Sequence, residues 1–163
     1  GVQDVIKILP ELTKKQRNIL FLIIGQDAGY YEKLKELISE LKLENNVKFI
    51  LNCNDEDRNA ILELSEIFIM PSEWEAFGIT ILEAMAKGNA ILSTKTEGGK
   101  FLVSKENGLL YEFNNFKKLQ EELEELIINN KIRNNMQINN IKKSKKFTWD
   151  KISIKLEEEY KKL

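Results

Sequence analysis

Short runs of apolar residues recur along the chain, and stretches with helical spacing separate them. Each run is continuous rather than alternating, which is typical of strands buried on both faces of a parallel sheet. Strands that alternate with helices favour an α/β fold: a doubly wound, Rossmann-like parallel sheet with helices on both faces. The predicted strands are Ile19–Ile24, Val47–Leu51, Glu66–Met70, Ala90–Ser93 and Asn107–Phe113.

The segments between these runs carry apolar residues three and four positions apart, the pattern of helices with one buried face. Asn and Asp residues that can accept backbone N–H bonds mark several helix starts, and Gly88 marks a helix end. We expect Thr94–Lys100 to be a loop. The predicted helices are Val2–Leu9, Tyr30–Leu41, a segment capped by Asn54 or Asp55, Thr80–Lys87, a segment capped by Asn114 or Asn115, Arg133–Lys146 and Asp150–Leu163.

The turn between the strand Glu66–Met70 and the next helix is where we expect chemistry. A helix that begins at Thr80 leaves its first backbone N–H groups without partners, and its dipole is positive at that end. Gly78 lets the backbone approach a ligand closely. The segment Phe77-Gly78-Ile79-Thr80 can therefore offer hydrogen-bond donors to an anion such as a phosphate.

Glu75 and Glu83 flank this donor segment with seven residues between them. Carboxylates beside a phosphate site are explained if the ligand also carries hydroxyls, because an ionised carboxylate accepts two hydroxyl donors. A nucleotide sugar has both kinds of group. A structural alternative stays open, since Thr80-x-x-Glu83 is also the pattern of a capping box and Glu75 follows Ser72 at a spacing that suits a local turn.

Composition narrows the classes of function. A chain of 163 residues, 42% hydrophobic and 31% charged, suits one globular domain, and a net charge of −1 gives no reason to expect nucleic acid as a partner. The chain has no His, and its one Cys, Cys53, excludes an intrachain disulfide and makes a zinc site improbable. We expect a soluble protein, because no stretch has the pattern of a signal peptide or a membrane span.

The stretch Glu75-Ala-Phe-Gly-Ile-Thr-Ile-Leu-Glu83 closely resembles the E-x7-E signature of family-4 retaining glycosyltransferases, which have the GT-B fold. Downstream, Gly98-Gly99 resembles the double-glycine loop of that family, although Lys100-Phe101 replaces the Pro-Glu pair that often follows. Asn107-Gly108-Leu109-Leu110-Tyr111 resembles its NGLL strand, and Phe147-Thr148-Trp149 its entry to the C-terminal helix. The resemblance covers essentially the whole chain and corresponds to the second, nucleotide-sugar-binding domain of the family.

The resemblance implies that residues 1–163 are the donor-binding, C-terminal half of a GT-B enzyme. On this reading the sequence is truncated. The N-terminal acceptor domain, the first strand of this domain, and an Arg and a Lys that neutralise the donor diphosphate lie upstream. The full enzyme is then expected to transfer a sugar with retention to a saccharide or lipid-linked acceptor, in the biosynthesis of cell-surface polysaccharide or glycoconjugates. We expect the isolated domain to be inactive.

The resemblance also implies roles for individual residues. Glu75 is expected to be the catalytic residue, which contacts the transferred sugar, and Glu83 to hold the ribose hydroxyls. No metal or other cofactor is expected. The remaining donor-binding residues are Phe77, Gly78, Ile79, Thr80, Gly98 and Gly99, and the base is expected beside the backbone of Leu51, Asn52, Cys53 and Asn54.

Two questions stay open at this point. The basic cluster Lys142, Lys143, Lys145 and Lys146 suits either a solvated helix C-terminus or a contact with anionic lipid at the inner face of the membrane, in a cytoplasmic protein. The alternative functions are a non-catalytic Rossmann-type nucleotide-binding module and a GT-B-fold nucleotide-sugar epimerase. The E-x7-E signature and the absence of His disfavour the epimerase.

Overall fold

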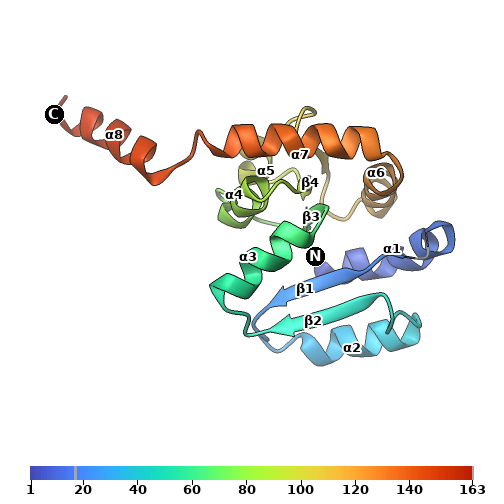
Figure 1. Cartoon of the computed structure of the whole chain (residues 1–163). Helices are drawn as coiled ribbons and strands as arrows, with labels where there is room; N and C mark the ends of the chain where they lie inside the picture. The colour runs from blue at the N-terminus through green and yellow to red at the C-terminus, as the bar shows by residue number, and fades with distance from the viewer. Residues whose placement is uncertain (17, 163) are drawn as a thin grey trace.

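A computed structural model describes residues 1–16 and 18–162, in which strands and helices alternate (Figure 1). Every strand pairing in this described part of the chain is parallel. The first half contains α1 (Val2–Lys15), β1 (Phe21–Gly25), α2 (Tyr31–Glu40), β2 (Val47–Leu51), α3 (Asp55–Leu64) and β3 (Ile67–Met70). The second half contains α4 (Ile79–Ala86), β4 (Ala90–Thr94), α5 (Glu97–Leu102), β5 (Gly108–Tyr111), α6 (Phe116–Ile128), α7 (Asn130–Ser144) and α8 (Trp149–Tyr160).

The strands form two hydrogen-bonded groups rather than one continuous sheet. β1 pairs with β2, and β4 lies between β3 and β5. The predicted α/β class with parallel strands is confirmed, but within the described residues no ladder joins the two groups. Gly1 lies between them in Figure 1, packed so closely on Pro71 that an added Cβ would lie 1.7 Å from the Pro71 carbonyl oxygen.

β4 is buried on both faces, as its continuous apolar run predicts. Successive side chains of a strand point to opposite faces. Ala90 and Leu92 accordingly join the core on the side of α1 and α6, whereas Ile91 joins a second core with residues of α3, α4 and α5. The predicted arrangement with helices on both faces is therefore confirmed around the β3-β4-β5 group.

β1 and β2 are buried less completely than the sequence predicts. Phe21 and Ile23 pack against the larger core, but Leu22 and Ile24, which point to the other face, belong to neither core. All of β1 is only half-buried or exposed. A continuous apolar run therefore indicated a strand correctly here, but not full burial.

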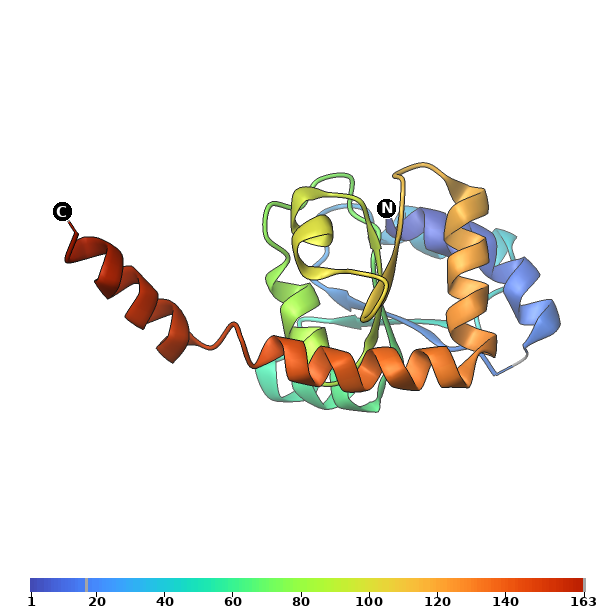
Figure 2. The same ribbon diagram turned by 90° about the horizontal axis from the view of Figure 1, so that it is seen from above.

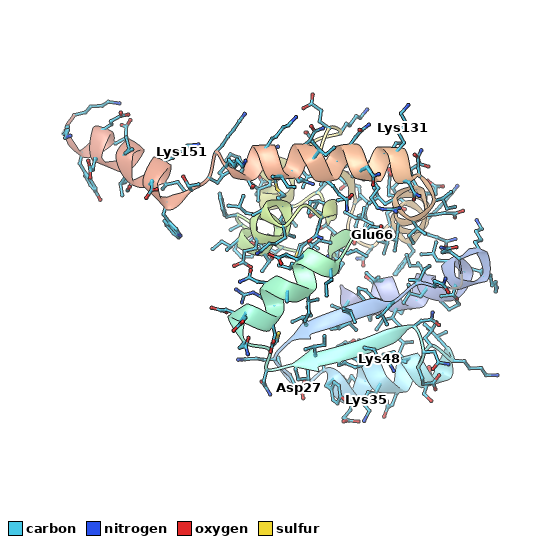
Figure 3. The ribbon with its side chains drawn as sticks, viewed as in Figure 1. Asp27, Lys35, Lys48, Glu66, Lys131 and Lys151 are labelled. Atoms are coloured by element: carbon cyan, nitrogen blue, oxygen red, sulfur yellow. The ribbon has the colours of Figure 1, made fainter. Side chains whose placement is uncertain are left out.

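α7 runs along the N-terminal edge of the β3-β4-β5 group and is fixed there by polar side chains. Arg133 donates to the carbonyl oxygens of Leu126 and Ile127 at 2.7 and 2.9 Å and pairs with Glu66, which lies just before β3 below α7 (Figure 3). The buried Asn140 donates to the carbonyl oxygen of Asn89, 2.7 Å away. These bonds from buried side chains hold α7 in one position, although the buried Arg133 Nε has no hydrogen-bond partner among the described residues.

Several element boundaries differ from the predicted ones. α1 continues through Pro10 to Lys15, because the apolar face extends to the buried Leu12. Thr94–Lys100 is not a loop throughout, since α5 begins at Glu97 with Thr96 as its N-cap. α8 projects away from the body with its apolar residues exposed (Figures 1 and 2). Leu163, the predicted end of this helix, lies outside the described residues.

Candidate functional site

The loop between β3 and α4, residues 71–78, lies at the C-terminal edge of the β3-β4-β5 group. This is the edge at which open α/β sheets bind ligands. The Thr94 hydroxyl, at the end of β4, donates to the Ser72 carbonyl oxygen at 2.6 Å. The Gly98 N–H donates to the Glu75 carbonyl oxygen at 2.9 Å. The loop is therefore fastened to both β4 and α5.

The carboxylate of Glu75 closes this loop on itself. Its Oε1 accepts the Gly78 N–H at 2.9 Å and the Phe77 N–H at 3.4 Å. Its Oε2 has no hydrogen-bond partner among the described residues. Glu75 thus has a local structural role, as the alternative interpretation allowed, but with Gly78 rather than Ser72. One carboxylate oxygen is left for a ligand.

α4 begins one residue earlier than predicted and has no side-chain cap. Gly78 is its N-cap, with a φ of 88° that favours glycine, and Ile79 is the first helical residue. Thr80 therefore lies inside the helix, and the capping-box interpretation of Thr80 and Glu83 is wrong. The exposed first turn of α4 keeps N–H groups and a positive dipole end available to an anion.

The predicted donor segment is therefore divided in two. The N–H groups of Phe77 and Gly78 already donate to Glu75. Those of Ile79 and Thr80 lie in the uncapped first turn of α4, where no side chain accepts from them. If a phosphate binds here, Ile79 and Thr80 are the donors that this arrangement leaves for it.

Glu83 lies one turn further along α4 and is held from the neighbouring helix. Arg58 of α3 donates from Nη2 to Glu83 Oε1 at 3.4 Å, and its Nη1 lies 3.1 Å from Asp55 Oδ1. The two side chains are about one third exposed. Arg58 could not be identified from the sequence, because no spacing rule links a residue of α3 to one of α4. The sequence feature that could have indicated Arg58 is its positive charge directly after the three acidic residues that begin α3.

The loops after β1 and β2 lie at the ends of the other strand pair. Asp27, labelled beside the end of β1 in Figure 3, accepts the N–H groups of Gly29, Tyr30 and Tyr31 through Oδ1, so this loop serves to start α2. The Asn52 N–H donates to the Gly25 carbonyl oxygen at 3.1 Å. The two loops are thereby joined.

The predicted base-binding segment, Leu51 to Asn54, has a special backbone. Asn52 adopts a φ of 55°, and Asn54 is the N-cap of α3, accepting the Asp57 N–H at 2.8 Å. Of the two predicted caps, Asn54 is thus the one used. Leu51 is 40% exposed, and Cys53 is half-buried. The segment leads directly into the helix that carries Arg58.

Gly98 and Gly99 are buried in α5 instead of lying in an open loop. A Cβ on Gly98 would lie 2.5 Å from the Phe77 carbonyl carbon, and one on Gly99 would lie 2.3 Å from the Thr94 carbonyl oxygen. The Gly98 N–H is bonded to Glu75, and the Gly99 N–H donates to Thr96 Oγ1 at 3.2 Å. In this structure the two glycines permit close packing against the Glu75 loop, and their N–H groups are already bonded.

A group of aromatic side chains, which the sequence pattern did not predict, adjoins the loop. The rings of Phe77, Phe101 and Phe147 lie 5.7 to 6.5 Å apart, centroid to centroid. Trp74, in the loop itself, is 79% exposed. No periodic pattern could have shown this group, because its members come from three separate segments.

Two ionisable side chains with shifted pKa values lie outside this loop. Burial raises the pKa of the Tyr111 hydroxyl at the end of β5, and the negative charge of Asp4 raises that pKa further. Lys142, Lys143 and Lys146, near the end of α7, line a hollow of about 390 Å³ with Ser104 and Glu106. Burial lowers the pKa of Lys143, as does the charge of Lys146, while Glu106 opposes this shift.

Metal-ligand clusters and membrane-spanning helices are absent from the part of the chain that the structure describes. Within residues 1–16 and 18–162, no cluster of three or more metal-ligating side chains is present. In the same part of the chain, no helix has the length and apolar character needed to span a membrane.

Residues 1–143 match the family described as glycosyl transferases group 1. The chain belongs to this family. It is 28% identical over 144 residues to the uncharacterized glycosyltransferase MJ1178 of Methanocaldococcus jannaschii, covering 88% of this chain and 40% of that protein. The chain therefore spans well under half the length of this relative.

Solved structures of glycosyltransferases share the fold. Anabaena Alr3699/HepE, crystallised in complex with UDP, superposes with a TM-score of 0.90 at 23% identity, over 100% of this chain and 45% of that one. The C-terminal domain of the group 1 glycosyltransferase LpcC from Francisella tularensis gives a TM-score of 0.81 at 24% identity, over 90% of this chain and 78% of that one. The chain has the fold of the C-terminal domain of a GT-B glycosyltransferase.

Proposed function

We propose that this domain binds a nucleotide-diphosphate sugar and that the whole protein is a family-4 retaining glycosyltransferase. The observation that carries the proposal is the uncapped start of α4 between Glu75 and Glu83. An anion placed there meets the positive end of a helix dipole, and each carboxylate retains an oxygen that can accept a hydroxyl. The Anabaena structure with UDP supports a nucleoside diphosphate as ligand.

In this proposal each part of the site has one task. The N–H groups of Ile79 and Thr80 bind the diphosphate and stabilise the negative charge that accumulates on it as the glycosidic bond breaks. Glu83 accepts the ribose hydroxyls. Glu75, held by Phe77 and Gly78 through Oε1, uses Oε2 to accept a hydroxyl of the transferred sugar and faces the positive charge that develops on the ring.

Catalysis needs groups that lie outside this chain. An acceptor domain and upstream basic residues are expected to complete the site. A further strand preceding Gly1 would fit between β1 and β3, where the two strand groups are not bonded to each other. The chain alone should therefore bind a nucleotide diphosphate weakly and transfer no sugar. Measurable turnover by the purified chain would contradict this part of the proposal.

We propose that donor binding needs no metal ion, because a helix N-terminus and upstream cations can neutralise the diphosphate. The acceptor is proposed to be a saccharide or a lipid-linked saccharide of the cell surface. A titration of the chain with UDP, GDP and ADP tests the proposal, and at least one should saturate. Failure of all of them to bind would overturn it.

We also propose that the end of α7 contacts anionic lipid at the inner face of the membrane. Support comes from the hollow lined by Lys142, Lys143 and Lys146, where burial already disfavours the charged form of Lys143. A phosphate group placed there would offset that cost. Lys145 follows in the same basic segment and would add attraction to the surface.

Vesicle flotation tests this contact. The chain should float with vesicles that contain phosphatidylglycerol and not with phosphatidylcholine vesicles, and replacing Lys142 and Lys146 by Glu should abolish flotation. Lys131→Glu, at the other end of α7, is the matched control and should float normally. Equal flotation of all variants, or none with either lipid, would contradict the contact.

A further inference from the structure

Arg58 joins two parts of the proposed site that are distant in the sequence. It lies in the first turn of α3, directly after the segment Leu51–Asn54, and its guanidinium reaches Glu83 on α4. The Nη2 to Oε1 distance is 3.4 Å. The predicted base-binding segment and the predicted ribose-binding carboxylate are therefore connected through this one side chain.

Arg58 sets the direction of the Glu83 carboxylate. Among the described residues Glu83 has no other side-chain hydrogen bond or ion pair, and it does not cap α4. An exposed glutamate without a partner samples several rotamers, and a ligand that binds it must select one of them. Because guanidinium is always protonated, its hydrogen bond to the Glu83 carboxylate is charge-assisted.

The arrangement is not the one that would be best for stability alone. Arg58 Nε is buried and has no hydrogen-bond partner within the described part of the chain, which costs free energy in the empty domain. The Asp55 contact of Nη1 holds the guanidinium from the exposed side. Only the Nε atom of Arg58 is buried in this way, and an unpartnered buried polar atom beside a carboxylate with an available oxygen calls for an explanation, which a binding role supplies.

We infer that Arg58 is a positioning residue for Glu83 and that it thereby determines recognition of the ribose cis-diol of the nucleotide. Glu83 Oε1 is held by the guanidinium, and Oε2 is presented to the 2′- and 3′-hydroxyls. This inference rests on the proposed function, in which Glu83 accepts those hydroxyls. It adds the residue that makes the carboxylate selective for a ribonucleotide.

Calorimetry with ribose and 2′-deoxyribose nucleotides tests the inference. UDP, GDP, ADP and their 2′-deoxy counterparts are titrated separately into the chain. The ribonucleotide that binds most tightly, together with its 2′-deoxy counterpart, is then used to compare the variants. Arg58→Met should weaken ribonucleotide binding by about three- to tenfold, the range expected when one hydrogen bond of ordinary strength is lost. It should also reduce the preference for ribose over deoxyribose, while Arg58→Lys should restore part of that preference. A merely structural role would leave the preference unchanged.

Lys87→Met is the matched control, because Lys87, the C-cap of α4, pairs with Glu63 in the last turn of α3 and so links the same two helices at their C-terminal ends. This variant should keep both the affinity and the preference. In a Glu83→Ala background, Arg58→Met should cause no further loss, since a positioning residue has nothing left to position.

The outcomes separate this inference from the function on which it rests. If Glu83→Ala weakens binding and removes the ribose preference while Arg58→Met changes neither, the role of Arg58 is refuted and the proposed function stands. The role of Arg58 is also refuted if Arg58→Met lowers ribonucleotide affinity by the same factor with and without Glu83, or by no more than Lys87→Met does. If Glu83→Ala itself leaves binding intact, the proposed ribose contact fails.

Discussion

Replacing Gly98 by alanine should displace the loop that carries Glu75. The new Cβ would lie 2.5 Å from the Phe77 carbonyl carbon, 2.6 Å from its oxygen and 3.0 Å from the Gly78 nitrogen. These are backbone atoms, so they cannot move aside as the end of a flexible side chain can. Forcing an extra methyl group into a packed site costs about 1–3 kcal/mol.

The location of Gly98 inside a helix has the opposite effect on the free energy of unfolding. Alanine is better than glycine inside a helix by about 0.5–1 kcal/mol, and Gly98 lies in α5. We therefore expect a net loss in the free energy of unfolding of about 1–2 kcal/mol, which lowers Tm by about 2–8 °C in a domain of this size. UDP affinity should fall about tenfold as the amides that follow Gly78 shift, the equivalent of one charge-assisted hydrogen bond.

Thermal unfolding and calorimetry at a temperature where both proteins are folded measure the two effects. Gly25→Ala is the matched control, because a Cβ there meets nothing within 4 Å, and it should leave both Tm and affinity unchanged. A Gly98→Ala protein with the Tm and the UDP affinity of the Gly25→Ala protein would refute the reasoning. It would show that the loop is not held by close packing on α5.

Three other predictions follow from the site and the core. Glu83→Ala should weaken nucleotide binding, whereas Glu75→Ala should leave nucleotide affinity within a few-fold and depress transfer by the full-length enzyme; equal effects in calorimetry and in rate assays would contradict this division of roles. Burial raises the pKa of Tyr111, so its stabilising contribution is complete below pH of about 10 and declines above it. Between pH 9 and pH 11, the free energy of unfolding in urea should therefore decrease more for the parent chain than for Tyr111→Phe. Equal decreases would argue against the raised pKa. Treatment with EDTA should not change UDP affinity in calorimetry, and a loss that Mg²⁺ restores would contradict metal-independent binding.

The sequence was sufficient to predict the strands and the helices other than α5, and it directed attention to the turn before α4. β4 and the turn before α4 followed from a continuous apolar run, Gly78 and the spacing of the two glutamates. These signals are local, since strand formation and helix starts depend on neighbouring residues. The position of β4 between β3 and β5 could be learned only from the structure, because strand order depends on long-range packing.

Side-chain partners could not be predicted in the same way. The hydrogen bond between Glu75 and Gly78 depends on the rotamer of Glu75. The hydrogen bond between Arg58 and Glu83 depends on both rotamers and on the distance between α3 and α4. A capping box was a reasonable local interpretation of Glu83, yet the helix starts at Ile79 with Gly78 as its N-cap, which places Thr80 two residues past the cap position. Gly98-Gly99 suggested a loop because glycine disfavours helix interiors, whereas close packing on Phe77 accounts for it.

The central claim is that the first turn of α4 binds the phosphates of a nucleotide, and amide chemical shifts test it most directly. The 15N-labelled chain is titrated with UDP, GDP and ADP, and the resonances are followed for each. The account predicts saturable shifts of the Ile79 and Thr80 amides with at least one nucleotide, strongly reduced in Glu83→Ala. Saturable shifts confined to other segments, with Ile79 and Thr80 unmoved, would contradict it.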